Sequence, residues 1–321
     1  MEFDGPDQMQ TNISHHTSSD IENPCTPLVH SMEEELERLS PLSSDCGIYR
    51  VRERLRHGHE RVYTPHIVSI GPLHHGKETL KDMEEHKMWY LKAFIGRTKE
   101  SMRFYVELVK QKEARLRRCY SEKIQCSSEE FIKIILVDAA FIIEVLLKFY
   151  FKELNGENDH IFNKPWMKRD IWRDMIMLEN QLPFFILEDL YDASKNIVQP
   201  ERRPSILKLS HYFFKNQVIN LGGIEDQKLE EIRSSKIEHF VDLLRQLYMP
   251  SKKLDKRQFE RETVPSLTEL HQAGVKFKVG SSRNLFDIHF EKGILEIPRF
   301  NVGPVSELII RNIVAFEQCS A

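Results

Sequence analysis

Apolar side chains recur at helical spacing along most of the chain. Positions three and four residues apart fall on one face of a helix, so an apolar stripe at that spacing indicates a helix packed against a core. Such stripes cover residues 78–95, 102–109, 169–178, 184–192, 237–248 and 305–316. The pattern therefore predicts a mostly helical protein.

One further helix, Phe131–Phe151, is apolar on nearly every side, and the capping-box pair Ser127 and Glu130 predicts its start. The segment carries four charged residues, Lys133, Asp138, Glu144 and Lys148. Those charges interrupt the roughly 20 apolar residues that a membrane-spanning helix needs, so we expect a core helix. A buried Asp138 then needs an ion pair or a cap to a neighbouring segment, and this interpretation is preferred over a general acid.

Local signals also predict where other helices begin and end. Ser235 and Glu238 form a second capping box, just before the fifth of these stripes. Pro183 has no backbone N–H and cannot lie in mid-helix, so we expect a kink or break beside it. Residues 195–233 and 250–263 are predicted to be polar connections that contain only short helical pieces.

The period of the pattern changes near the C-terminal end. Residues 275–279 and 285–290 alternate apolar and polar positions, which is typical of a half-buried strand. Gly293 allows a tight turn into 294–297. We therefore predict a small antiparallel β-sheet near residues 275–298, within an α+β fold that is mostly α-helical.

Charge is distributed unevenly over the 321 residues. Residues 1–45 hold ten Asp and Glu against one base, Arg38, and show no apolar period. We predict a disordered, acidic segment there, with a short helix at 32–39. Residues 46–321 hold 45 bases and 39 acids and form the folded domain. The two oppositely charged parts can shield each other or meet different partners, and the simplest interpretation is two solvated surfaces.

Cysteine usage and the N-terminal residues bear on the cellular compartment. The five cysteines are odd in number and form no CxxC pair, which favours free thiols in a reducing compartment. The N-terminal run MEFDGPDQMQ is acidic and polar, unlike a secretory signal. We therefore expect a cytoplasmic protein, and we expect no cofactor.

The run from Gly71 to Lys77 fits the phosphate-loop pattern G-x-x-x-x-G-K, with Gly76 as its second glycine, and it follows the strand-like residues 66–70. A nucleotide-binding enzyme that uses Gly71, Gly76 and Lys77 is therefore one hypothesis. Two features oppose it. Glu78 replaces the hydroxyl that would bind magnesium, and Pro72 removes one amide donor. We expect no nucleotide binding.

Two other polar groups suggest chemistry. His74 and His75, together with Glu84, Glu85 and His86, have metal-ligating side chains, but Glu85 and His86 cannot face the same way on one helix. We therefore expect no metal site.

The second group is Glu179, Asn180 and Gln181, just before Pro183. We expect their side chains to satisfy backbone groups that the proline leaves free, and catalysis by the group is the alternative.

The basic stretch at 50–61 can contact phosphates of a lipid or a nucleic acid. Only Tyr49 and Tyr63 provide aromatic rings for base stacking, so nucleic acid is not an expected partner. A solvated surface is the simplest interpretation. Peripheral contact with an anionic membrane is the alternative, and it would use Arg50, Arg52, Arg54 and Arg56.

Eight ordered blocks of sequence resemble one plant family, the domain-of-unknown-function family 247, also called uncharacterised protein family 0481. The blocks are residues 46–51, 63–76, 83–87, 137–144, 178–185, 273–277, 293–298 and 311–319. His74, His75, Asp138, Glu179, Asn180 and Gln181 lie in these blocks, and the resemblance assigns them no role.

The resemblance implies an uncharacterised plant protein without established catalytic residues. The family includes candidates for pollen-side recognition in grass self-incompatibility, and its longer members typically end in a membrane helix. The chain departs from the pattern at Arg52, where proline is usual, and it stops at Ala321, so it resembles a C-terminally shortened member. We expect a non-enzymatic protein–protein interaction or recognition module with an unknown protein partner. A nucleotide-dependent enzyme and a nucleic-acid binder are the alternatives.

Overall fold

The computed structural model describes residues 1, 26–37, 47–157, 159–194, 203–217, 226–249, 265–282, 284, 286–300 and 302–320. The chain divides into two compact units, Met1–Ser44 and Asp45–Ala321. In the first unit, helix α1 spans Thr26–Glu37 and exposes apolar side chains, including Met32 and Leu36. This helix begins before the predicted one at 32–39. Most of the predicted disordered segment lies outside the described residues.

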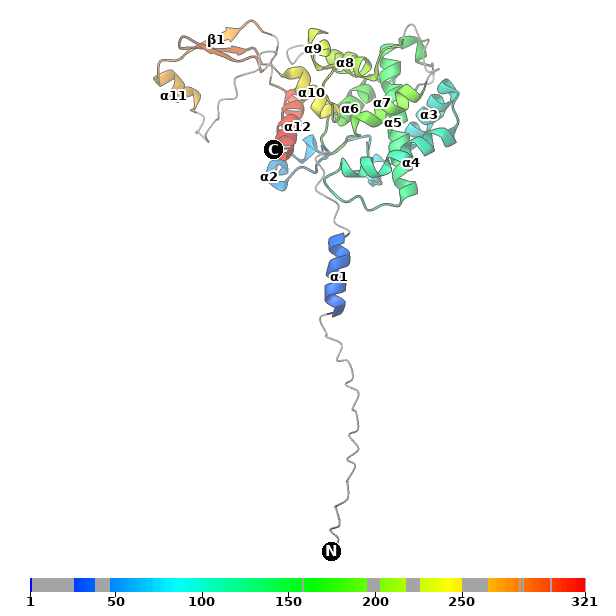
Figure 1. The fold of residues 1–321 in the computed structure, drawn as a ribbon. Coiled ribbons are helices and arrows are strands. Elements are labelled where there is room, and N and C mark those ends of the chain that lie inside the picture. The colour runs from blue at the N-terminus through cyan, green and yellow to red at the C-terminus, as the bar shows by residue number, and fades with distance from the viewer. Residues whose placement is uncertain are drawn as a thin grey trace. The chain divides into compact units, whose positions relative to one another are not determined.

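Helix α5, Ser128–Tyr150, is the central element of the second unit (Figure 1). The Ser127 hydroxyl caps it by accepting a hydrogen bond from the backbone N–H of Glu130 at 3.1 Å. Four helices pack against it, α3 (Asp82–Thr98), α4 (Met102–Arg118), α7 (Phe184–Ala193) and α8 (Ile206–Gln217). Every residue from Phe131 to Lys148 except Lys133 is buried. The predicted central helix is therefore confirmed.

The break predicted at Pro183 is also confirmed. Helix α6 spans Pro165–Met175, and α7 begins directly after Pro183, which occupies its N-cap position. The residues between the two helices form a buried turn. This turn carries the Glu179–Gln181 group, so its side chains face the interior of the unit.

Two sequence-based predictions about helices are wrong. The supposed polar connection at 195–233 contains α8, which buries Leu209 and Phe214, and also α9, Asp226–Ile232. Helix α10, Phe240–Tyr248, begins after His239 rather than at the predicted capping box. The last helix, α12, spans Pro304–Ser320 and packs against α10.

The C-terminal sheet has three strands, β1 (Lys276–Gly280), β2 (His289–Glu291) and β3 (Ile294–Pro298), preceded by helix α11 (Leu267–Gln272). Its order is β1–β3–β2. Strand β2 pairs with β3 antiparallel, but β1 pairs with β3 in parallel. The α+β, mostly helical fold is confirmed, and the sheet is mixed rather than wholly antiparallel.

The strand-like residues 66–70 form no strand, and the backbone there runs as an irregular segment. The stretch before it contains the short helix α2, Glu53–Arg56, and a 3₁₀ turn at Glu60–Val62. Two further 3₁₀ turns lie at Glu78–Leu80 and Lys152–Leu154. None of the described helices is long and apolar enough to cross a membrane.

Candidate functional site: a buried polar cluster and the adjoining cleft

Glu179 lies in the turn between α6 and α7, and its side chain is fully buried. Its Oε1 accepts hydrogen bonds from the backbone N–H of Val51, at 2.7 Å, and from the Arg56 guanidinium. Its Oε2 lies 3.4 Å from Nη1 of Arg50 and 3.1 Å from Nε2 of His74. Burial opposes ionisation, but these neighbours lower the pKa of Glu179 overall. The carboxylate therefore holds the basic segment to the helical turn.

Asp138 lies on α5 and pairs with a buried lysine of α3. The Nζ of Lys87 lies 2.5 Å from Asp138 Oδ1, donates to the carbonyl oxygen of Ser69 at 2.9 Å, and lies 2.6 Å from Glu84 Oε1. Burial opposes the lysine charge, but the two carboxylates raise the pKa of Lys87 overall. The other oxygen of Asp138 accepts the backbone N–H of Gly71 at 2.8 Å. The predicted ion pair of Asp138 is therefore confirmed.

The irregular segment at 66–70 is held by side chains instead of a neighbouring strand. The carboxylate of Asp174 accepts the backbone N–H groups of residues 66–68 at 2.8–2.9 Å. The amide of Asn180 accepts the N–H of Ile70 at 2.7 Å and donates to the carbonyl of Val68 at 3.0 Å. Because buried backbone groups must be paired, these side chains replace a β-ladder.

Gln181 joins the same turn to α10. Its Nε2 donates to the carbonyl oxygens of Met175 and Met177, each at 2.7 Å. Its Oε1 accepts the backbone N–H of Phe240 at 3.0 Å. The Glu179–Gln181 group therefore satisfies backbone groups, but several of these belong to distant segments, at Val51, residues 68–70 and Phe240, and are not groups that Pro183 leaves free.

The Gly71–Lys77 run does not have the strand–loop–helix context of a phosphate loop. The segment before it is not a strand, and α3 begins only after the 3₁₀ turn at 78–80. Gly71 has a φ of +73°, and a Cβ there would lie 2.7 Å from the carbonyl oxygen of Gln181. Its N–H is bonded to Asp138. Close packing against the Gln181 turn therefore explains why residue 71 is a glycine.

Residues suggested as metal ligands are not assembled into a site. In the described part of the chain, no three His, Cys, Asp or Glu side chains are placed to hold one metal ion. His74 is buried beside Glu179, and burial lowers the pKa of its imidazole. Glu84 lies against Lys87 instead.

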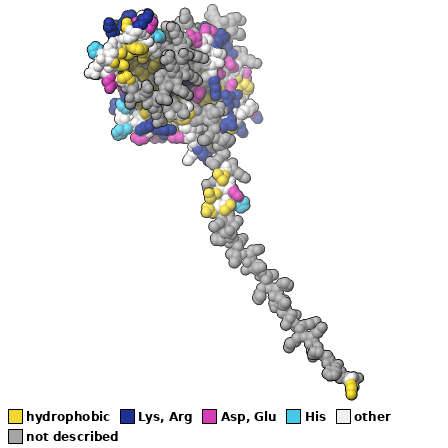
Figure 2. Space-filling view, turned by 60° about the vertical axis from the view of Figure 1, so that its left-hand side comes forward, with side chains coloured by type: hydrophobic (Ala, Val, Ile, Leu, Met, Phe, Trp, Pro, Cys, Tyr) yellow, Lys and Arg dark blue, Asp and Glu magenta, His cyan; other side chains and the backbone are white. Residues whose placement is uncertain are grey.

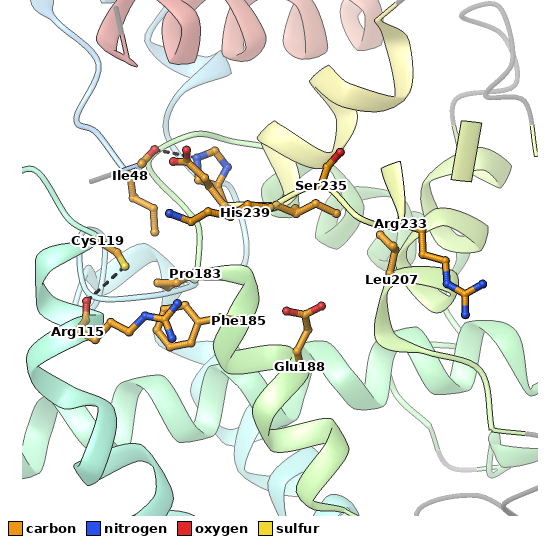
Figure 3. Close-up of a pocket in the computed structure, with 14 residues that line it drawn as sticks. Ile48, Arg115, Cys119, Pro183, Phe185, Glu188, Leu207, Arg233, Ser235 and His239 are labelled. Atoms are coloured by element: carbon orange, nitrogen blue, oxygen red, sulfur yellow. Dashed lines mark hydrogen bonds between the residues drawn. The ribbon is translucent and has the colours of Figure 1, made fainter. Parts of the chain in front are cut away.

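A cleft with about 190 Å³ of space open to water adjoins the buried cluster, on the side of α10 (Figure 3). Arg115 of α4 and Cys119, directly after α4, form one part of the wall, and α7 contributes Phe185 and Glu188. The opposite wall is the segment 233–239. The sequence-based analysis did not identify this cleft, because its walls come together only in the folded chain.

Hydrogen bonds fix the wall formed by residues 233–239. His239 is fully buried, and its Nε2 lies 2.7 Å from the carbonyl oxygen of Gly47. Its Nδ1 accepts the backbone N–H of Asp242 at 3.2 Å, so the imidazole is neutral, and burial lowers its pKa to about 4. The N–H of Phe184 donates to the carbonyl of Glu238 at 2.7 Å. A Cβ on Gly47 would meet the Glu238 carboxylate, so the Glu238 side chain would have to move for a larger residue to fit there.

The small sheet has one apolar face. The pairing places Phe277 and Phe290 beside Leu295, with Val279 beside Ile297 on the same face. The exposed fractions are 38% for Phe277, 66% for Val279 and 63% for Phe290. Figure 2 brings the side of the molecule that carries the sheet forward, and apolar side chains gather there beside Lys and Arg. Large apolar side chains are thus open to solvent.

The arginines proposed to contact a membrane divide into two kinds. Arg50, which is exposed, and Arg56 are bonded to Glu179, whereas exposed Arg52 and Arg54 have no ion pair among the described residues. Contact with an anionic membrane stays a prediction, and the second kind could make it without breaking an ion pair.

Several buried charges were not singled out from the sequence as functional. Asp159 accepts hydrogen bonds from Tyr90 and Lys148, and Glu144 binds Arg97 through two bonds at 2.9 and 3.0 Å. The available signal was the presence of charged residues in the otherwise apolar helix α5. Their partners lie elsewhere in the sequence, so the signal could not identify them.

Comparison with known proteins gives a family match. Residues 48–321 match the model of DUF247, described as a plant protein of unknown function. The UPF0481 protein At3g47200 of Arabidopsis thaliana is 28% identical over 300 residues, an alignment that covers 85% of this chain and 61% of the relative. The putative UPF0481 protein At3g02645 of the same plant is 25% identical over 380 residues, covering 89% and 70%. The chain thus spans less than two thirds of the first relative. No solved structure matches.

Proposed function

The chain belongs to the DUF247 family of plant proteins, and from this premise we propose that it is a non-enzymatic protein–protein interaction module. The proposed occupant of its small sheet is an extended segment of a partner protein, added as a strand beside β1. The observation that carries the proposal is the exposed apolar face of the sheet next to the edge strand β1. Exposed apolar patches and open strand edges are common sites of protein association.

The buried polar cluster supports a non-enzymatic role. Asp138, Glu179, Asn180 and Gln181 are each at most 1% exposed. Their polar atoms bond to backbone groups or to basic side chains within the unit. Side chains used in this way hold the fold together and are not presented to a substrate.

The chemistry of β1 suggests the chemistry of the partner. Strand β1 pairs with β3 on one side, and its other edge meets no strand in the described part of the chain. Its apolar side chains, Phe277 and Val279, alternate with Lys276 and Lys278. Only the second lysine has an ion pair there, with Glu296 at 2.6 Å. A partner segment that alternates apolar and acidic residues would match the apolar face of β1 with its apolar residues and the lysine face with its acidic residues.

The test is selection of binding peptides from a random library, followed by anisotropy measurements with the selected peptides. We expect enrichment of alternating apolar and acidic residues. Val279→Lys should weaken binding at least about tenfold. The matched control is Met102→Lys, which changes an exposed apolar residue on α4 and should bind like the unmodified protein. Selection without this alternation, or full binding by Val279→Lys, would contradict the proposal.

Pollen-side recognition in self-incompatibility, for which the family that the chain resembles includes candidates, is one setting for such a module. Peripheral contact with an anionic membrane is a separate part of the proposal, and exposed Arg52 and Arg54 support it. Sedimentation with phosphatidylserine vesicles tests it. Binding should fall with added salt and with alanine at both positions. Binding that salt does not change would exclude this electrostatic contact.

A further inference from the structure

Two charged side chains in the cleft beside His239 have no oppositely charged partner among the described residues. The guanidinium of Arg115 lies 3.7 Å from the centre of the Phe185 ring. Glu188 lies one turn further along α7 and makes neither an ion pair nor a hydrogen bond with the residues that the structure describes. Glu188 is an exposed residue, but partial desolvation of its carboxyl group and the nearby carboxylates of Asp192 and Asp189 raise its pKa. A cation placed at Glu188 would relieve this electrostatic cost.

The rest of the cleft presents the basic residues Arg233 and Lys236, the acidic residue Glu238, and apolar surface. Figure 3 shows Glu188 between Arg115 on one side and Arg233 on the other. Arg233 is 3.4 Å from Glu230, an exposed pair that provides little neutralisation. Leu207 and Ile237 add apolar surface to the walls. The space open to water in the cleft is about 190 Å³, which limits any ligand to a small molecule.

The walls are held before any ligand arrives. Lys112 of α4 lies 2.8 Å from Asp189 of α7, which links the two helices that carry Arg115 and Glu188. On the other side, His239 and Gly47 fix the 233–239 segment. A preformed site loses less conformational freedom when a ligand binds.

We infer that this cleft binds a small zwitterion of amino-acid or dipeptide size, with its ammonium group at Glu188 and its carboxylate at Arg115. A simple anion would be repelled by Glu188, and a simple cation by Arg115 and Arg233. A ligand that carries both charges satisfies both groups. An apolar side chain on the ligand would contact Leu207 and Ile237. This inference is independent of the interaction proposed for the sheet.

Titration calorimetry with four probes tests the inference on the full chain. The probes are leucine, leucyl-leucine, N-acetyl-leucine, which lacks the ammonium group, and leucinamide, which lacks the carboxylate. At least one zwitterion should bind, and each blocked compound should bind at least about tenfold more weakly. Comparison of leucine with leucyl-leucine decides the ligand size. No saturable binding of either zwitterion up to about 10 mM, or equal binding of all four probes, would overturn the inference.

Substitutions of Glu188 and Arg115 test the roles assigned to these two residues. Glu188→Gln and Arg115→Met should each weaken zwitterion binding at least about tenfold. The matched controls are Glu153→Gln and Arg118→Met, which change exposed charges outside the cleft and should leave binding unchanged. Circular dichroism and thermal melting establish that each variant is folded. Unchanged binding by folded Glu188→Gln and Arg115→Met would reject the assigned roles.

Discussion

Around α5, charged and amide side chains are buried, whereas in the β1–β3 sheet large apolar side chains are exposed. Lys87 and Glu179 have no exposed side-chain surface, and Asp138 has 1%. Val279 and Phe290 are each more than 60% exposed. The buried polar groups must be paired to be tolerated, but the exposed apolar groups gain stability only when something covers them. The buried polar cluster around α5 therefore stabilises the fold, and the sheet is suited to association with another molecule.

The largest expected effect is from breaking the buried ion pair. Asp138→Ala leaves the Lys87 ammonium buried with only its neighbour Glu84 and the Ser69 carbonyl. We expect a loss of about 3–5 kcal/mol in the free energy of unfolding, measured by urea denaturation. The double variant Lys87→Met with Asp138→Leu removes both charges and should recover most of the loss. A single variant as stable as the unmodified protein would contradict the importance of the pair.

The next largest effect is a pH dependence that comes from His239. Its pKa is lowered from an ordinary 6.5 to about 4, so between these values the unfolded chain binds more protons than the folded protein. The free energy of unfolding should therefore contain a contribution that is complete above about pH 6.5 and is lost as pH falls towards 4. It amounts to about 1.4 kcal/mol per pH unit within that window.

The contribution of His239 must be separated from that of Asp174, whose pKa burial raises to about 6 and whose effect has the opposite sign. The comparison of His239→Gln with the unmodified protein does this, because Asp174 titrates in both. The stability of His239→Gln should rise less steeply between pH 4 and 6.5. Parallel stability curves would show that the imidazole titrates normally in the folded protein.

A smaller loss should follow removal of one amide that replaces the β-ladder. Asn180→Ala leaves the buried N–H of Ile70 and the carbonyl of Val68 without this partner. We expect a loss of about 2–3 kcal/mol in the free energy of unfolding and faster amide exchange at Ile70. Asn163→Ala is the control, because that side chain makes one exposed bond. Equal losses for the two variants would argue against the bonding role of Asn180.

Substitutions on the exposed face of the sheet should change the free energy of unfolding much less than substitutions in the buried cluster. Phe290→Lys and Val279→Lys change side chains that are mostly exposed, so the free energy of unfolding should change by only about 0.5 kcal/mol. Thermal melting and urea denaturation measure this. A loss above about 2 kcal/mol would mean that the apolar face is already packed against the protein.

The last prediction is that the protein does not bind nucleotide. Calorimetric titration with magnesium-ATP should give no heat of binding, because Glu78 stands at the magnesium position and the Gly71 N–H is already bonded to Asp138. The Lys77→Ala variant should likewise give no heat of binding with magnesium-ATP. Micromolar binding that this variant abolishes would restore the hypothesis of a nucleotide-dependent enzyme.

The sequence was sufficient where the cause is local. The Ser127 cap, the apolar surface of α5 and the break at Pro183 all depend on interactions within a few residues. Local reasoning failed for α8, whose apolar residues lie between polar flanks in one long connection. It also failed at Ser235 and Glu238, because the 233–239 segment packs against Gly47 and Phe184 instead of starting a helix.

By itself, the sequence determined which residues would need partners and which would alternate along a strand. A charge in an apolar helix and a period of two can both be identified in the chain without its fold. Only the tertiary structure decided the partners, since Lys87 is 51 residues from Asp138 and Val51 is 128 residues from Glu179. It also decided that the apolar face of the sheet is left exposed and that Arg115 and Glu188 face one cleft. Periodicity describes a residue's own element, whereas pairing and exposure depend on which distant elements pack beside it.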